Sequence, residues 1–560
     1  MGGADRRTAA GGAPATPGSA DADRLDSWKE IAAQLRREVR TVQRWEKSEG
    51  LPVHRHLHQR LGSVYAYRSE LDAWWKARRS DLERAPRQRR TMIAVLPIEN
   101  WSREPEHEYL SDGITEEMIV ELGRLNPERL GVIARQSAMA YKGTKKRADE
   151  IGRELGVDYL VGGSARRGNR RLRVTAHLIQ VKDQSELWAE TYDRDLGDLL
   201  ALQHEVAATI AQKIRVALAP HVAPRGRRET NAEAYEAYLY GRFWLNKRTP
   251  EAFGRAFSSF ERAAAFDPRS ALPHTGLADY YNLLAYYGAA PPMSVYPKAR
   301  EAAQKAIELE ETLPEAHALL AEVSYLYDWD WENAEREFGR AVELGPNCVI
   351  AHQWYGVFLS LLARRDEASR ELRAAERLDP LSVLVGTQIG LALYEARQYE
   401  AAIERLRRTL ELDASFPLAH TCLGMACLQR SLYDEAIAAL ERARQLAPAD
   451  LTPLALLGYA HALAGRRSEA RKFLRSLKAL SKERPVSAAY ACAVHIGLGE
   501  LEAALDLAEQ ACEERSGFLT RLKVEPLLDP LRSEPRFAKL LRTVGLAEPV
   551  RSRALADTPA

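Results

Sequence analysis

The sequence predicts a multidomain protein with a small winged helix-turn-helix, an α/β middle domain and an all-α superhelix of repeats. Three observations support this fold class. Residues 24–90 carry 17 Lys and Arg against nine Asp and Glu, whereas the whole chain has a net charge of +2. Residues 92–98 form an apolar run of strand length, followed by alternating helix and strand patterns. In the second half, alanine recurs every 34 residues, at Ala334, Ala368, Ala402, Ala436, Ala470 and Ala504.

Length and composition are those of a globular protein with several domains. A chain of 560 residues is too long for one core, and 46% hydrophobic with 28% charged residues is usual. No apolar window is long enough to indicate a membrane span. Residues 1–23 are predicted as a disordered leader and residues 547–560 as a disordered tail. We therefore expect a cytoplasmic protein without a membrane partner, whose five cysteines are buried, reduced thiols.

Residues 24–80 have the pattern of two short helices joined by a tight turn. Ser27 and Glu30 match a capping box at the start of the first helix. After a four-residue break, a second helix begins near Thr41, with Val42 and Trp45 on its inner face. This pattern predicts a helix-turn-helix, whose second helix enters the major groove of DNA.

Polar and basic residues occupy the outer face of the second helix and the stretch after it. The amide of Gln43 and the guanidinium of Arg44 suit bidentate bonds to adenine and guanine, so we expect them to contact bases. The other basic residues are expected to contact phosphates of double-stranded DNA. The predicted DNA-binding residues are Arg40, Thr41, Gln43, Arg44, Lys47, Arg55 and Arg60. The alternative is that these are solvated charges on a small helical domain that binds protein.

An alternating stretch from Val53 to Tyr67, with a turn at residues 62–63, predicts a β-hairpin wing, and a third helix follows at residues 70–78. The stretch SWKEIAAQLRREVRTVQRWEKSEGLPVHRH and the later GSVYAYRSELDAWW resemble the winged helix-turn-helix of MerR-like and excisionase-like DNA-binding proteins. This resemblance implies that the second helix reads the major groove while the wing contacts the flanking backbone. The wing tip departs from the family pattern, because it is His-rich where Arg and Gly are usual.

His54, His56 and His58 alternate along the predicted wing, so they would share one face of a strand. A metal site is one interpretation, but a clear fourth ligand is absent and no cysteine lies nearby. We expect a polar wing surface and no metal.

Residues 81–90 are predicted as a linker and residues 91–219 as the α/β domain. Strands are expected at 92–98, 131–135, 159–166, 171–181 and 185–192, and helices at 111–125, 146–155 and 199–218. The stretches VLPIENWSREPEHEYLSDGITEEMIVELGRL, VIARQSAMAYKG and ELGVDYLVGGSARRGNRRLRV resemble the TolB N-terminal-like domain. This resemblance implies a binding or assembly role and supplies no catalytic residues.

Short catalytic motifs are absent from the α/β domain. Gly162 and Gly163 are not followed by the Gly-Lys-Ser/Thr of a phosphate loop. Asp112, Glu116 and Glu117 fall at the start of an expected helix, where negative charge is favourable at the helix dipole; a catalytic pair is the alternative. We therefore expect no catalytic residue, no cofactor and no enzyme activity.

Residues 220–230 are predicted as a second linker and residues 231–546 as the repeat array with a C-terminal capping segment. Glycine stands twelve places before the alanine in several units, as at Gly356, Gly390 and Gly424, and proline closes units at Pro346 and Pro380. A 34-residue period is that of the tetratricopeptide (TPR) repeat, a helix–turn–helix unit. Two helices approach closely only where small side chains meet, and proline ends the second helix. Another helical hairpin array is the alternative.

Two stretches depart from the regular repeat. Tyr325, Tyr327, Trp329 and Trp331 occupy the turn of the third unit, where they form either interlocking core or a ligand cage. From Ser516 the period fails, and we expect the remaining chain to seal the last repeat interface.

Together these patterns predict a bacterial DNA-binding transcriptional regulator whose TPR array mediates protein–protein interaction through its groove. The alternative is a TPR scaffold or adaptor protein in which the helix-turn-helix docks protein. A third hypothesis is a small effector bound in the middle domain. A homodimer stays open as well, because MerR-like modules commonly act as dimers but no heptad run is present here.

Overall fold

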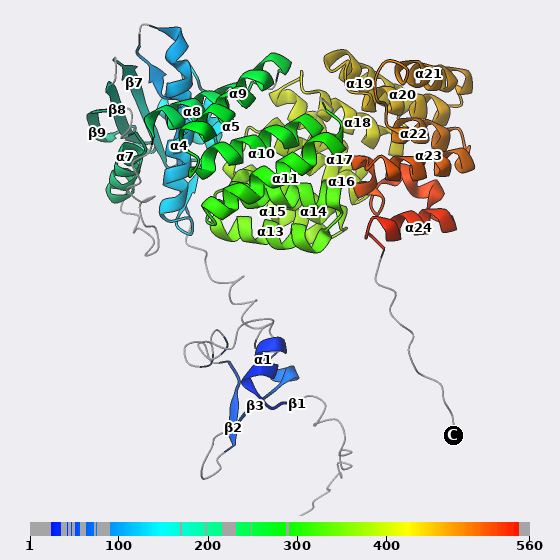
Figure 1. The fold of residues 1–560 in the computed structure, drawn as a ribbon, viewed down its shortest axis with the longest axis horizontal. Coiled ribbons are helices and arrows are strands. Elements are labelled where there is room, and N and C mark those ends of the chain that lie inside the picture. Colours follow the sequence, from blue (N-terminus) through cyan, green and yellow to red (C-terminus); the bar gives the residue numbers. More distant parts are fainter. Residues whose placement is uncertain are drawn as a thin grey trace, which may run out of the picture. The chain divides into compact units, whose positions relative to one another are not determined.

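The computed structural model describes residues 24–34, 42, 46, 51–56, 63–71, 74, 90–102, 104–168, 171–195, 199–214, 231–247, 249–286 and 290–547. The chain divides into two compact units, Met1–Arg89 and Arg90–Ala560. The second unit contains an α/β domain and a long helical array (Figure 1).

The N-terminal unit is a three-stranded antiparallel sheet with short helical segments. Its elements are β1 (Arg24–Leu25), α1 (Trp28–Gln34), β2 (His54–His56) and β3 (Ser63–Tyr67), in the sheet order β1-β3-β2. Residues 68–71 and 74 are helical as well. Its core consists of Leu25, Ile31, Ala32, Val42, Leu51, Ala66 and Leu71. The expected hairpin is therefore present as β2 and β3, and Val42 faces inward as expected.

The capping pattern at Ser27 sets where α1 begins. The Ser27 hydroxyl accepts a hydrogen bond from the backbone N–H of Glu30 (3.2 Å), and the Glu30 carboxylate accepts one from the N–H of Asp26 (2.9 Å). The predicted reciprocal cap is thus formed, with Glu30 reaching one residue further back than in the usual capping box.

The α/β domain is built on a six-stranded mixed sheet. Its strands are β4 (Thr91–Val95), β5 (Glu99–Asn100), β6 (Leu130–Val132), β7 (Tyr159–Arg167), β8 (Arg171–Gln180) and β9 (Glu186–Asp195). The order is β6-β4-β7-β8-β9, with β5 beside β7. The strands β4 and β5 are parallel to β7, whereas β7, β8 and β9 are antiparallel. Its helical segments are η1 (Pro105–His107), α4 (Glu108–Leu125), α5 (Arg135–Met139), α6 (Ala148–Leu155) and α7 (Leu199–Lys213).

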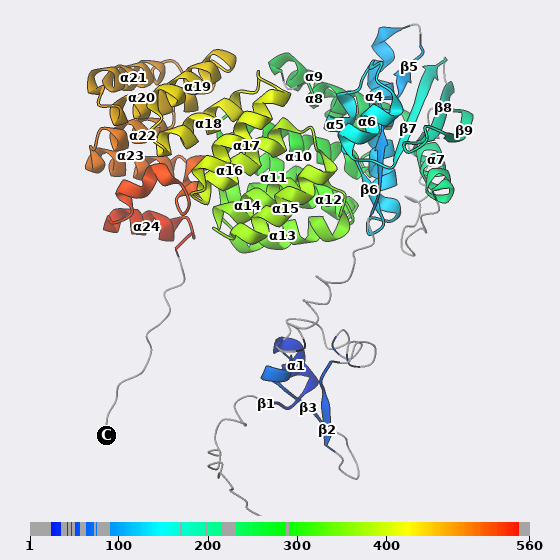
Figure 2. The same cartoon turned by 180° about the vertical axis from the view of Figure 1, so that it is seen from behind.

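Helices cover both faces of this sheet (Figures 1 and 2). Ile93 of β4 packs in one core cluster with Ile114 of α4 and Val206 of α7, whereas the next residue, Ala94, packs with Ile151 of α6 in another. Because successive side chains of a strand point to opposite faces, both faces of β4 are apolar and buried. This explains why residues 92–98 read as a continuous apolar run.

Two strands of the α/β domain end earlier than expected. The strand expected at 131–135 ends at Val132, and α5 begins at Arg135. The intervening Ile133 is fully buried, so its apolar character reflects burial in a loop. Similarly, β4 ends at Val95 before Pro97, and Ile98 enters the core after the turn. Apolar runs report burial, which is not confined to strands.

The array consists of eight helix pairs among the described residues, followed by short helical segments. The pairs are α8 (Ala232–Leu245) with α9 (Pro250–Phe266), α10 (Ala271–Tyr286) with α11 (Pro292–Leu309), α12 (Pro314–Val323) with α13 (Trp331–Leu344), α14 (Val349–Leu361) with α15 (Arg365–Leu378), α16 (Val383–Glu395) with α17 (Tyr399–Leu412), α18 (Pro417–Gln429) with α19 (Tyr433–Leu446), α20 (Thr452–Leu463) with α21 (Arg467–Leu480), and α22 (Ala488–Gly497) with α23 (Leu501–Glu513). A π-helical turn, η3 (Ser324–Asp328), joins α12 to α13. The chain then continues through η4 (Gly517–Arg521), η5 (Pro526–Leu531) and α24 (Pro535–Thr543).

Small residues lie where the paired helices approach most closely. Ala436 and the other alanines of the 34-residue series are at most 2% exposed. A Cβ atom at Gly424 would lie 2.6 Å from Cγ of Leu440, and one at Gly390 would lie 2.6 Å from Cγ of Leu406. The sequence period therefore records a packing requirement of the helix pairs.

All five cysteines were expected to be buried, which is confirmed for three of them and wrong for two. Cys422, Cys427 and Cys492 are buried, but Cys348 and Cys512 are partly exposed. All five are free thiols. The two exceptions lie at helix ends, where the array leaves side chains partly open to solvent.

Candidate functional site

Two glutamates from helical positions contact strand β2 of the N-terminal unit, one through each of its faces. His54 donates from Nε2 to the Glu70 carboxylate (2.6 Å) and stacks on the ring of Tyr65. The next residue, Arg55, forms an ion pair with Glu46. Adjacent residues of a strand point to opposite faces, so β2 is tied to residue 70 on one side and residue 46 on the other.

Arg55 is the predicted DNA-binding residue whose position is described. Its side chain is 57% exposed, while that of its partner Glu46 is 17% exposed. The other six predicted residues, Arg40, Thr41, Gln43, Arg44, Lys47 and Arg60, lie outside the described residues. Their role in DNA binding stays a prediction.

The predicted histidine series is only partly described. His54 uses its Nε2 atom for Glu70, while His58 and the side chain of His56 lie outside the description. Among the described residues, no group of three or more His, Cys, Asp or Glu side chains is arranged to hold a metal ion.

Acidic residues of α4 connect the α/β domain to the first helix of the array. Glu116 pairs with Arg242 of α8 (2.6 Å) and with Arg135 of α5 (3.3 Å), and Arg242 also pairs with Asp279 of α10 (3.1 Å). Burial opposes ionisation of Glu116, but the two guanidinium groups outweigh it and lower the pKa of this carboxyl. Glu116 is therefore an ionised bridge between three helices.

The helix-dipole interpretation of these acidic residues is wrong. Because α4 begins at Glu108, three residues earlier than expected, Asp112 and Glu116 lie in later turns of the helix. Asp112 pairs with Lys142 (2.6 Å), and Glu117 is buried as well. The partners of Asp112 and Glu116 come from other elements, so these two side chains bind the domain together and do not serve the helix terminus.

Loops between repeats form a second set of contacts with the α/β domain. The Asp379 carboxylate accepts hydrogen bonds from the backbone N–H (2.9 Å) and hydroxyl (2.5 Å) of Ser137, and the N–H of Leu381 donates to that hydroxyl (2.8 Å). One repeat earlier, Arg90 donates to the Asn347 side chain (2.6 Å). The α/β domain is thus attached to several successive repeats.

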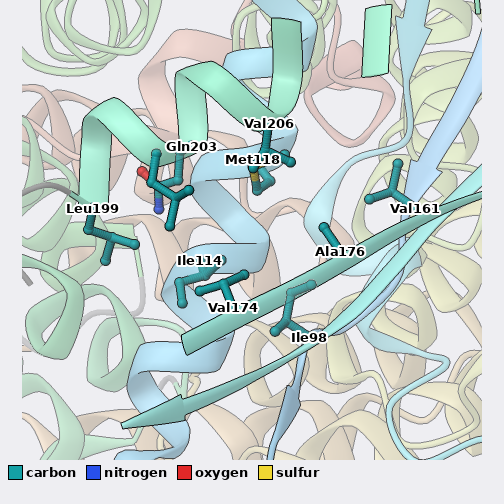
Figure 3. Close-up of a pocket in the computed structure, with 10 residues that line it drawn as sticks. Ile98, Ile114, Met118, Val161, Val174, Ala176, Leu199, Gln203 and Val206 are labelled. Carbon is teal, nitrogen blue, oxygen red and sulfur yellow. The ribbon is translucent and has the colours of Figure 1, made fainter. Parts of the chain in front are cut away.

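The cavity between the sheet, α4 and α7 is small and apolar. Figure 3 shows Gln203 and Val206 of α7 facing Ile114 of α4 and Val174 of β8 around it. Its volume of about 20 Å³ is room for one water-sized molecule. The Gln203 amide accepts from the Tyr235 hydroxyl of α8 (3.1 Å), while its Nε2 atom finds no hydrogen-bond partner among the described residues. A metabolite-sized effector does not fit this space.

The C-terminal segment Arg515–Leu546 does more than seal the last repeat. Arg515 lies over the ring of Trp329 (4.1 Å), and the indole N–H of Trp331 donates to the Val544 carbonyl (2.6 Å). Tyr325, in the same turn, is buried against Phe338 and Phe358. The aromatic turn of the third unit is therefore interlocking core, and part of it holds a segment about 200 residues further along the chain.

A buried charged cluster fixes this segment to the first helices of later pairs. Arg521 lies 3.1 Å from both Glu395 and Glu525, whose side chains are 4% and 3% exposed. Tyr394 donates to Glu525, and Ser360 donates to Glu395. Burial raises the pKa of Glu395 despite the opposing effect of Arg521. The C-terminal segment is thus held against α16 by buried charged and polar groups.

Histidines at one position of the repeat were missed by the sequence reasoning. His317 donates from Nδ1 to Glu337 (2.7 Å) and from Nε2 to the carbonyl of Glu311 (2.9 Å), and His352 makes the same pair of bonds one unit later. His420 bonds the carbonyl of Ala414 in the same way. The signal was the dipeptide Ala-His, which recurs at the start of α12, α14 and α18.

The tetratricopeptide repeat family matches residues 387–450, which span most of α16 to α19. Together with the helix pairs and their small-residue contacts, this match shows that the chain contains TPR repeats in an all-helical superhelix. TPR proteins bind protein partners, so the array suggests protein–protein interaction.

Curated relatives cover only part of the chain. The chain is 36% identical over 236 residues to "Putative adenylate cyclase 3" of Rhizobium meliloti (strain 1021), a match that covers 41% of this chain and 39% of the relative. The chain is 24% identical over 226 residues to "Transcriptional regulator HilA" of Salmonella typhimurium, a match that covers 39% of this chain and 39% of the relative. The chain thus spans about two-fifths of the length of the curated relatives it matches.

The expectation of no enzyme activity is contradicted by the first of these relatives. A protein named as a cyclase shares 36% identity with 41% of this chain. Our expectation rested on missing short motifs, and a catalytic site assembled from dispersed residues leaves no such motif.

Several solved structures resemble parts of the chain. Pseudomonas aeruginosa PilF is 20% identical, with a TM-score of 0.30, over 41% of this chain and 98% of that chain. YrrB, a TPR protein, is 19% identical, with a TM-score of 0.25, over 35% and 95%. The Cut9–Hcn1 complex is 15% identical, with a TM-score of 0.33, over 62% and 55%.

Among the helices that the structure describes, none combines the length and apolar character required to cross a bilayer.

Proposed function

We propose that the chain is a cytoplasmic DNA-binding transcriptional regulator whose TPR array receives a protein partner. The observation that carries the proposal is the N-terminal unit, where a helix, a buried core through Val42 and an antiparallel hairpin occur in a basic segment. These features support the winged helix-turn-helix that the sequence predicts. The partial match to the regulator HilA supports the same function.

In this proposal the two classes of DNA contact are divided between different residues. Gln43 and Arg44 contact base edges in the major groove. Arg40, Thr41 and Lys47 contact the backbone, and Arg55 and Arg60 add contacts from the wing. The 57% exposure of the Arg55 side chain supports a contact from the wing.

The α/β domain, which resembles a TolB N-terminal-like domain, would communicate with the array through its ion pairs. Glu116 with Arg242, and Ser137 with Asp379, place polar contacts on both helices and loops of the repeats. A partner bound to the array would act on these contacts. Homodimer formation belongs to the same proposal and is measured by light scattering of the full chain.

The test is a gel shift of the full chain with fragments of its own upstream DNA over a salt series. Arg44→Ala should reduce base preference by about 1–3 kcal/mol, because a bidentate base contact is lost. Lys47→Ala should weaken binding to all sequences alike and reduce the salt slope by about 1. Absence of salt-dependent affinity for any duplex would sink the regulator proposal and favour a TPR scaffold whose first unit docks protein.

A second candidate function is carried by the 36% identity to a protein named as an adenylate cyclase. If the shared 236 residues take part in cyclisation, the purified chain incubated with ATP and Mg²⁺ or Mn²⁺ should release cyclic AMP in proportion to protein concentration. Without product, the shared residues belong to a part of the relative that does not carry its chemistry.

A further inference from the structure

The wing arginine of the N-terminal unit is not a free cation. Arg55 on β2 pairs with the carboxylate of Glu46, a helical residue one turn after the buried Val42. Glu46 is largely covered at 17% exposure, whereas Arg55 is 57% exposed. Glu46 is therefore the more constrained member of the pair, and the exposed guanidinium is the member that can move.

We propose that Glu46 is a positioning residue that holds Arg55 away from the DNA backbone and so weakens DNA binding that is independent of sequence. This inference rests on the proposed DNA-binding function. In the free protein the pair has no net charge, so it attracts no phosphate. Contact with a phosphate requires Arg55 to leave Glu46 or to share its donors between two anions.

Electrostatics decides the direction of the effect. A phosphate brought to Arg55 also approaches the Glu46 carboxylate, and two anions near one cation repel each other. An exposed ion pair contributes at most about 1 kcal/mol, so exchange of Arg55 to a phosphate is energetically accessible. Glu46 thus sets how much the wing adds to affinity without abolishing that contribution.

The neighbouring pair in the same strand supplies a matched control. His54 lies next to Arg55 in β2 and pairs with Glu70, whose side chain is 42% exposed. Glu70→Gln removes one negative charge, as Glu46→Gln does, but it releases no arginine. Comparison of the two variants separates the release of Arg55 from a general change in net charge.

The experiment measures the affinity of the full chain for a duplex of unrelated sequence over a salt series. Each phosphate neutralised adds about 0.9 to the slope of log affinity against log salt. Glu46→Gln should therefore steepen the slope by about 0.9 and raise affinity about threefold to fivefold at low salt. The double variant Glu46→Gln with Arg55→Ala should return to the slope of Arg55→Ala alone.

Each outcome decides between the alternatives. A slope for Glu46→Gln equal to that of the unmodified chain, or equal to that of Glu70→Gln, overturns the inference while DNA binding stands. A loss of affinity in Glu46→Gln with an unchanged circular dichroism spectrum also overturns it, because Glu46 would then assist Arg55. Glu46→Ala repeats the test with a side chain that cannot hydrogen-bond to Arg55, whereas the amide of Gln still can. If no protein, including the unmodified chain, binds duplex DNA in a salt-dependent way, the proposed function itself fails.

Discussion

Ion pairs have different physical settings in the N-terminal unit and in the repeat array. In the first, Arg55 is 57% exposed and faces one carboxylate. In the array, Arg521 lies between two carboxylates that are 4% and 3% exposed. An exposed pair is screened by salt and exchanges partners readily, whereas a buried charge that loses its partner stays without compensation. The same residue types therefore form a pair that can exchange partners in one region and a permanent attachment in the other.

The position of the C-terminal segment on the repeat array limits which surface of the array can bind a partner. The segment Arg515–Leu546 already packs against the aromatic turn at Tyr325 and against Tyr394 of α16. An external protein partner consequently needs either another face of the array or displacement of this segment. From the sequence, the aromatic turn of the third unit was either interlocking core or a ligand cage. In the structure, this turn holds the chain's own C-terminal segment.

The largest expected effect comes from breaking the buried cluster. Arg521→Met leaves Glu395 and Glu525 buried without their cation, and should lower the free energy of unfolding by about 3–5 kcal/mol. Urea denaturation followed by tryptophan fluorescence measures it. The control is Arg397→Met, because Arg397 pairs with Asp529 at the surface (2.5 Å), where a loss of at most about 1 kcal/mol is expected. Equal losses in the two variants would contradict the distinction between the two settings.

A smaller effect is expected from the pH dependence of His317. Both ring nitrogens face acceptors, Glu337 and the Glu311 carbonyl, so both bonds require the protonated ring. Burial opposes protonation, but these two acceptors outweigh it and raise the pKa of His317 above its ordinary value. A raised folded-state pKa stabilises the fold fully below the unfolded pKa near 6.5, and this stabilisation is lost as pH rises through the folded pKa.

Unfolding measured from about pH 6 to pH 8 should therefore lose roughly 1 kcal/mol of stability in the unmodified chain. His317→Gln should flatten this part of the pH profile. His420→Gln is the matched control, since the single bond of His420 to Ala414 requires only a neutral ring. An unchanged profile in His317→Gln would show that the imidazolium is not formed.

The smallest effect on stability is expected at the exposed pair of the N-terminal unit. Glu46→Gln should change the free energy of unfolding by less than about 1 kcal/mol, because its partner is mostly solvated. The salt dependence of DNA affinity should nevertheless change, as argued above. A stability loss comparable to that of Arg521→Met would mean that this pair, too, is structural.

Much of the local structure could be read from the sequence. The 34-residue period indicated the helix pairs, because Gly390 and Gly424 leave no space for a Cβ atom. The cap at Ser27 and the hairpin paired at His54 and Tyr65 followed from short-range rules. One error arose because a buried apolar residue, Ile133, was assigned to a strand although it lies in a loop. Another arose because α4 begins at Glu108, before the apolar pattern by which it was recognised.

The sequence by itself determined most of the helices, strands and repeats, because those depend on neighbours within a few residues and on a fixed spacing. Only the tertiary structure decided that Glu46 holds Arg55, that Glu116 bridges to Arg242, and that the segment after Ser516 reaches Trp331. Such contacts join side chains far apart in the chain. Their partners depend on how whole elements pack together, and no spacing within the sequence encodes that arrangement.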